Sequence, residues 1–169
     1  MTYSGGITGT CIQKTVTDNV ETNIFVSPEL EETSNEGTYA SPFGHIAKAL
    51  SYANEFASET SGTATINIYL LGGGDHYMTR NAKYYLYTNM SKSNDISYNH
   101  QITIQPAFCG NTIAGHVFSN GDTDCINSGT KIKVYYKMGN FYRFMIPRSL
   151  TINSVEFDAL DSSIDPSES

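Results

Sequence analysis

The chain lacks tryptophan, has few charged residues and contains no long apolar run. It has 169 residues, of which 16% are charged. No apolar stretch approaches the ~20 residues that a membrane-spanning helix needs, so we expect no membrane insertion. The low charge disfavours a helical bundle or a coiled coil, whereas 12 Tyr, 8 Phe and 14 Gly favour a β-rich fold. The length fits one domain or a piece of a larger protein.

An excess of basic residues is also lacking, because the net charge is −7. Only the middle of the chain, residues 63–150, is net basic, and its cations are scattered. Lys131, Lys133 and Lys137 accompany Ile132 and Val134 in an alternation typical of the solvated face of a strand. We therefore expect no nucleic-acid partner. No cofactor is expected either.

Cysteine is scarce, and its spacing excludes a zinc site of the usual kind. The three cysteines, Cys11, Cys109 and Cys125, form no C-x-x-C pair. Cys109 and Cys125 bracket a loop rich in Gly, Asn, Asp and Thr. This composition favours a disulfide if the chain is exported, worth roughly 3 kcal/mol. Two free thiols in a reducing compartment are the alternative.

The first residues lack the basic and apolar regions of a signal peptide. Either the protein is intracellular, or Met1 is not the natural start of an exported or surface chain. We divide the sequence into a polar N-terminal extension with short strands (1–36), a folded region (37–160) and an acidic flexible tail (161–169).

One amphipathic helix is predicted over about residues 42–58. Ser41 can cap its free N–H groups, and Pro42 suits a first helical position. Helical spacing is shown by the following apolar residues: Phe43, Ile46, Ala49, Leu50, Ala53, Phe56 and Ala57. His45 and Lys48 fall on the opposite, polar face.

Short strands are predicted on both sides of this helix, at residues 22–26, 65–71, 84–87, 101–105, 131–136, 141–146 and, as two pieces, 149–158. Glycines 72–74 predict a tight turn. A single helix among many strands argues against a doubly wound α/β sheet. An antiparallel β-sandwich remains an alternative, favoured by a turn at Met138-Gly139-Asn140.

Few residues are candidates for chemistry, so no catalytic or metal-binding residue is assigned. The carboxylates of Asp158, Asp161 and Asp165 are closest in sequence, but a solvated tail explains them. Asp122 and Asp124 could hold calcium, although loop formation is the simpler interpretation. The histidines, His45, His76, His100 and His116, form no H-x-x-x-H pair.

Tyrosine offers the remaining candidate site. Aromatic rings could form a face for a carbohydrate or a partner protein, and the alternative is that they are ordinary strand residues. The candidates are Tyr84, Tyr85, Tyr87, Tyr135, Tyr136 and Tyr142.

Three segments resemble a known family. Residues 37–50 and 66–77 contain a G-t-x-x-x-P-F-x-x-I-x-x-A-L run followed by I-x-I-x-L and G-x-x-Y, and resemble the entry of the right-handed parallel β-helix of the pectin-lyase-like family. Residues 149–157 resemble a later coil, and residues 157–162 are similar to ciliate-type cysteine-rich surface proteins. The resemblance implies an all-β fold, a short right-handed parallel β-helix with the helix as its cap. It leaves room for three or four coils.

The resemblance says little about reaction, because such helices serve enzymes and scaffolds alike. We expect a non-catalytic structural or recognition module, the terminal part of a β-helical surface or extracellular protein. The alternative is a polysaccharide lyase or glycoside hydrolase. A stack that ends at residues 149–158 leaves a bare edge, which predicts weak self-association that strengthens with salt.

Overall fold

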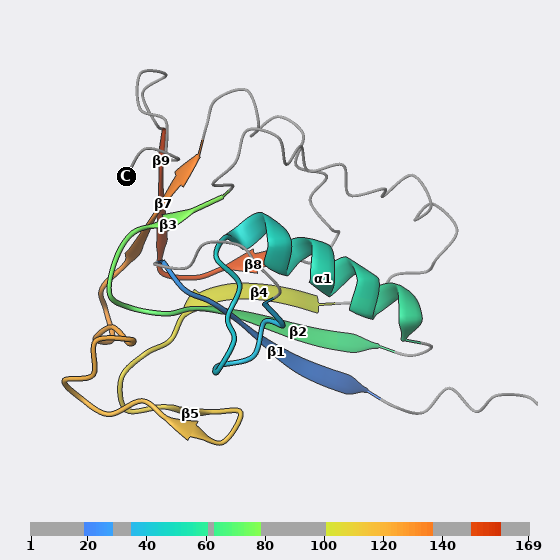
Figure 1. Cartoon of the computed structure of the whole chain (residues 1–169), viewed down its shortest axis with the longest axis horizontal. Coiled ribbons are helices and arrows are strands. Elements are labelled where there is room, and N and C mark those ends of the chain that lie inside the picture. The colour runs from blue at the N-terminus through green and yellow to red at the C-terminus, as the bar shows by residue number, and fades with distance from the viewer. Residues whose placement is uncertain (1–18, 29–34, 61–62, 79–100, 137–149, 160–169) are drawn as a thin grey trace, which may run out of the picture.

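The computed structural model describes residues 19–28, 35–60, 63–78, 101–136 and 150–159, and this part of the chain is rich in strands. Its largest sheet has four strands in the order β1-β2-β4-β8. These are β1 (Val20–Val26), β2 (Ala64–Leu70), β4 (Gln101–Pro106) and β8 (Leu150–Ile152). Every neighbouring pair is parallel (Figure 1).

The parallel register places residues of the same type beside each other on neighbouring strands. Ile66 lies beside Ile102, and Ile68 lies beside Ile104, which in turn lies beside Ile152. Strand β2 buries every second side chain, as the alternation in the sequence predicts. The antiparallel sandwich is therefore wrong for these strands, because β2 and β4 would have to run in opposite directions.

A second, three-stranded sheet has the order β3-β7-β9 and is also parallel. Its strands are β3 (His76–Tyr77), β7 (Ile132–Tyr136) and β9 (Val155–Ala159). From β2 onward the described chain alternates between the two sheets: β2 is followed by β3, β4 by β7, and β8 by β9. The two pieces predicted within residues 149–158 are thus β8 and β9, one in each sheet.

The single described helix, α1 (Ile46–Glu59), begins four residues later than predicted. Phe43 is held in extended backbone beside β1, where its N–H donates to the Phe25 carbonyl and its carbonyl accepts from Ser27 N–H. Helical backbone is excluded there, so Ser41 and Pro42 do not open the helix. His45 is the N-cap, and its Nδ1 accepts from Lys48 N–H at 3.1 Å. His45 is buried rather than on a polar face.

The main core lies between α1 and the two sheets (Figure 1). Helix α1 covers one face of the four-stranded sheet with Ile46, Ala49, Leu50, Ala53 and Ala57, the apolar stripe that the sequence predicts. The opposite face of β1 carries Phe25, which belongs to a second cluster with Leu71, Ala107, Ile113 and Phe118. That second cluster supports the loop between β4 and β7.

Several expectations lie outside the described residues. These are the strands at 84–87 and 141–146, the turn at 138–140, and side chains of Cys11, His100, Asp161 and Asp165. Four of the candidate tyrosines, Tyr84, Tyr85, Tyr87 and Tyr142, lie outside them as well.

Candidate functional site on the disulfide loop

A disulfide closes the loop between β4 and β7. Cys109 and Cys125, the two cysteines for which a bond was favoured, are joined with their Cα atoms 5.1 Å apart. The loop contains a small antiparallel hairpin of β5 (Thr112–Ile113) and β6 (His116–Val117). Ala114 and Gly115 turn it with positive φ at both positions, as a two-residue hairpin turn requires.

The loop is fixed against the end of β2. Gly72 N–H donates to the Asp124 carbonyl at 2.8 Å. A Cβ on Gly72 would lie 2.6 Å from the Cys125 carbonyl oxygen, so only glycine allows this approach. The neighbouring Gly73 supplies the positive φ of the predicted turn. The sequence thus predicts the turn but not the close contact that Gly72 permits.

Asp122 has a local role. Its Oδ2 accepts from Ser119 N–H at 2.7 Å, which closes a short turn within the loop. This is the loop-forming role that the sequence offered as the simpler interpretation.

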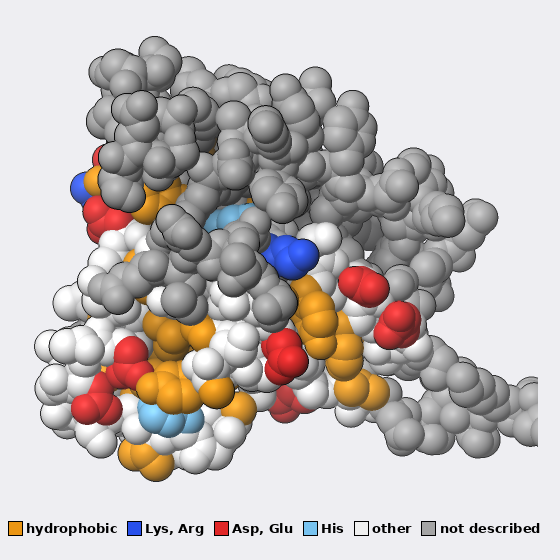
Figure 2. Space-filling view, viewed as in Figure 1, with side chains coloured by type: hydrophobic (Ala, Val, Ile, Leu, Met, Phe, Trp, Pro, Cys, Tyr) orange, Lys and Arg blue, Asp and Glu red, His pale blue; other side chains and the backbone are white. Residues whose placement is uncertain are grey.

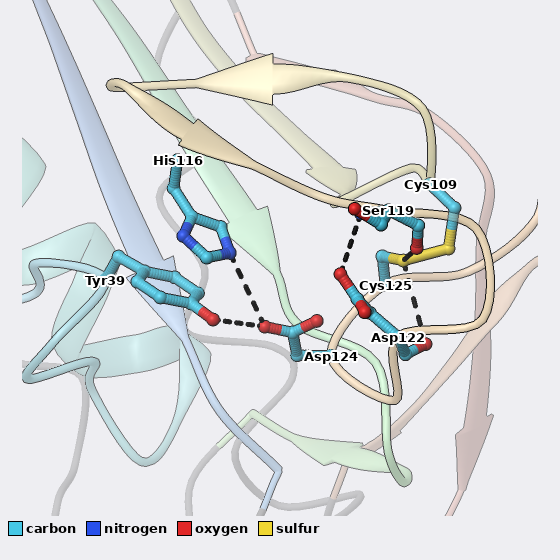
Figure 3. A network of polar contacts seen from close by, with 7 residues as sticks. All are labelled: Tyr39, Cys109, His116, Ser119, Asp122, Asp124 and Cys125. Atoms are coloured by element: carbon cyan, nitrogen blue, oxygen red, sulfur yellow. Dashed lines mark hydrogen bonds and ion pairs between the residues drawn. A yellow bond between two sulfur atoms is a disulfide. The ribbon is translucent and has the colours of Figure 1, made fainter.

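Asp124 instead joins residues from distant parts of the chain. Tyr39 lies 85 positions earlier, and its hydroxyl donates to Asp124 Oδ2. The His116 ring stacks on the Tyr39 ring at 3.6 Å, and its Nε2 lies 3.9 Å from the same carboxylate oxygen. Phe118 meets both rings edge-on. We call Tyr39, His116, Phe118 and Asp124 the Tyr39 cluster; Figure 3 shows its polar members converging.

The carboxylate controls the ionisation of Tyr39. The hydrogen bond to Asp124 favours the neutral phenol, and burial and nearby negative charge act in the same direction, raising the pKa of Tyr39 to about 12. Tyr39 is therefore a hydrogen-bond donor at neutral pH. Asp124 Oδ1 is buried and has no hydrogen-bond partner among the residues that the structure describes.

The arrangement suits binding better than nucleophilic chemistry. The Tyr39 hydroxyl is already committed to Asp124, and His116 stacks on the tyrosine ring without a hydroxyl or thiol to activate among the described residues. His116 and Asp124 keep part of their side-chain surface exposed. Figure 2 shows hydrophobic side chains gathered beside a histidine and acidic side chains near the β5–β6 hairpin. Such a surface offers stacking area together with polar contacts.

The two described tyrosines of the predicted aromatic face have different surroundings. The ring of Tyr135 lies 5.6 Å from that of Tyr77, with Lys133 Nζ 5.7 Å from its centre. Tyr136 packs against the main core. Asp158, from the predicted carboxylate group, lies near Lys133 Nζ at 3.7 Å on the surface.

Sequence reasoning missed the Tyr39 cluster. Asp124 and His116 were noted separately, but Tyr39 was not singled out, and 77 positions separate it from His116. Nothing in the local pattern signals that the segment between β1 and α1, which carries Tyr39, meets the disulfide loop.

No protein-family model, curated protein or solved structure gives a significant match to the chain. Within the described ranges, no group of three or more His, Cys, Asp or Glu side chains is arranged to hold a metal ion. The same ranges contain no helix of the length and apolarity that a membrane crossing demands.

Proposed function

We propose that the chain is a non-catalytic structural or recognition module, the terminal part of a β-helical surface or extracellular protein. Its fold would be a short right-handed parallel β-helix, with α1 as the cap of its first coil. The alternation of the chain between two parallel sheets supports this architecture. The disulfide is of the kind found in exported proteins.

One observation carries the functional proposal: burial falls off at one end of the stack. Ile68, Ile104 and Ile152 lie in register, and their exposed fractions are 0%, 3% and 41%. Ile152 thus leaves an apolar position of the core ladder open at an end strand of the sheet. An end that pairs with further protein explains it.

The carboxylates do not favour the enzyme alternative. A polysaccharide lyase or glycoside hydrolase needs acidic groups that converge on a groove. Asp158 lies near Lys133, Asp122 closes a turn, and Asp124 binds Tyr39. Each of these described carboxylates thus has a contact within the chain, and no two of them share one.

Turnover assays test the proposal. Purified protein incubated with polygalacturonate, with and without calcium, is expected to release neither unsaturated products nor new reducing ends. Turnover that is lost in Asp158→Ala but kept in the matched Glu156→Ala would contradict it and favour the enzyme.

A further inference from the structure

We propose that residues 150–159, which we call the β8–β9 edge, bind a parallel β-strand of another protein in which apolar and basic residues alternate. The inference rests on the proposed recognition function and adds the chemistry of the partner. Strand addition of this kind draws affinity from main-chain hydrogen bonds and specificity from alternate side chains.

Both parallel sheets end at this segment. β8 is the last strand in the order β1-β2-β4-β8, and β9 is the last in the order β3-β7-β9. Within the described parts of the chain, no strand pairs with the outer side of either. A corner at Asn153 and Ser154 joins them, and both are tied inward: Asn153 N–H donates to the Ile104 carbonyl and the Ser154 carbonyl accepts from Ile132 N–H. The two edges therefore lie end to end with a fixed corner between them, and each is a template for an added strand.

The inward side chains define the apolar half of the partner. Leu150, Val155 and Phe157 are only partly buried, and Ile152 is exposed. Their register partners one strand inward, Ile102, Ile104, Ile132 and Val134, are all buried. An added strand with aliphatic residues at alternate positions would bury this edge in the same way.

The outward side chains define the charge of the partner. Glu156 and Asp158 are exposed on the other face of β9. On its inner side β9 already pairs with a strand of the expected kind: Lys133 of β7 is in register with Glu156, and its Nζ lies 3.7 Å from Asp158 Oδ2. A strand added on the free side meets the same two carboxylates, so lysine or arginine is favoured at its outward positions.

A second copy of this chain is a poorer occupant. Its β8–β9 edge would bring Glu156 and Asp158 against their own equivalents. At the opposite ends of the sheets, β1 carries the exposed Glu21 and the exposed Asp75 immediately precedes β3. Of the described end strands, β1 and β9 carry exposed acids and β3 follows one, whereas β8 carries no charge. Self-pairing at β9 therefore opposes like charges, whereas a basic strand does not.

The test uses synthetic strand peptides and the whole 169-residue chain. The probe is a blocked peptide of about eight residues, the length of an ordinary strand, in which lysine alternates with isoleucine or valine. The control peptide has glutamate in place of each lysine. Calorimetry is expected to show that the lysine peptide binds at least about tenfold more tightly than the glutamate peptide, and that its affinity falls as salt screens the charges.

Variants locate the binding. Glu156→Lys combined with Asp158→Lys is expected to weaken binding of the lysine peptide about tenfold or more, because two attractions become repulsions. The matched control, Glu36→Lys with Glu59→Lys, makes the same charge change at exposed positions away from the edge and should leave affinity unchanged. Ile152→Gln should weaken both peptides, because it removes apolar contact without changing charge. Amide exchange should slow within residues 150–159 only.

Equal binding of both peptides, binding that survives the double reversal, or no binding at millimolar peptide would overturn the inference. If turnover is also absent and self-association still rises with salt, the recognition function survives and only the basic partner is refuted. Turnover of a polysaccharide would refute the recognition function itself.

Discussion

At the scale of single residues, the Tyr39–Asp124 contact makes stability depend on alkaline pH. The pKa of Tyr39 is raised from 10.0 to about 12 in the folded chain, because Asp124 accepts its hydrogen bond. A raised tyrosine pKa adds stability that is complete below pH 10 and is lost as the pH rises through about 12. We expect the free energy of unfolding to fall across this window, as measured by urea titration at fixed pH.

Asp124→Asn removes the charge that holds the proton on Tyr39. The pKa of Tyr39 should return toward its usual range, and ultraviolet titration should show the shift as a difference between each protein and its Tyr39→Phe version. Glu59→Gln is the matched control, because this exposed carboxylate is not among the groups that shift Tyr39. An unchanged titration in Asp124→Asn would mean that burial and the charge of Asp122 set the pKa of Tyr39.

Residues whose role depends on distant contacts could not be predicted from the sequence. Asp122 was predictable as a turn-forming residue, since its partner is three positions away. Asp124, Gly72 and His45 were not. Asp124 and Gly72 act on segments far along the chain, and His45 caps α1 only because Phe43 is held by β1.

At the scale of elements, the cost of truncating an isoleucine should decrease along the row formed by Ile68 of β2, Ile104 of β4 and Ile152 of β8. Ile68→Ala and Ile104→Ala remove buried side chains and should each cost about 2–5 kcal/mol of unfolding free energy. Ile152→Ala, at 41% exposure in the same register, should cost less than about 1 kcal/mol. Chemical denaturation measures all three, and equal costs would show that the β8 end is as closed as the rest.

The disulfide loop is a second element with a measurable contribution. Its cysteines are 16 positions apart, for which loop entropy predicts about 3 kcal/mol. Cys109→Ala combined with Cys125→Ala should lose about this much and should lower the pKa of Tyr39, because the loop holds Asp124 in place. Val117→Ala, an exposed change in the same loop, is the control and should be nearly neutral.

Elements with a clear period were the predictable part of the fold. Alternating Ile and polar residues predicted the strands at 65–71, 101–105 and 131–136 to within one or two positions of β2, β4 and β7. The helix stripe was equally clear, but its start was not. Phe43 continues the apolar period of α1, yet it pairs with β1, and periodicity cannot tell these two uses apart.

At the scale of the whole molecule, apolar side chains and negative charge are combined at one end. Glu156 and Asp158 are exposed on β9, and β8 and β9 present partly exposed apolar side chains in the same region. Apolar contact favours pairing of two copies there, whereas like charges oppose it. The two effects respond oppositely to salt, since only the repulsion is screened within ~10 Å at 0.1 M.

Self-association through residues 149–158 should therefore be weak at low salt and stronger at high salt. Light scattering across a salt series should show the mean mass rising, and Ile152→Gln should reduce the rise by removing apolar contact at the edge. Glu156→Gln combined with Asp158→Gln should shift the rise to lower salt, because less repulsion remains to be screened. The same increase in salt concentration should weaken the binding of a lysine-containing strand, because salt there screens an attraction to the acidic edge. A protein that stays monomeric at every salt concentration would mean that the β8–β9 edge does not pair with a copy of itself.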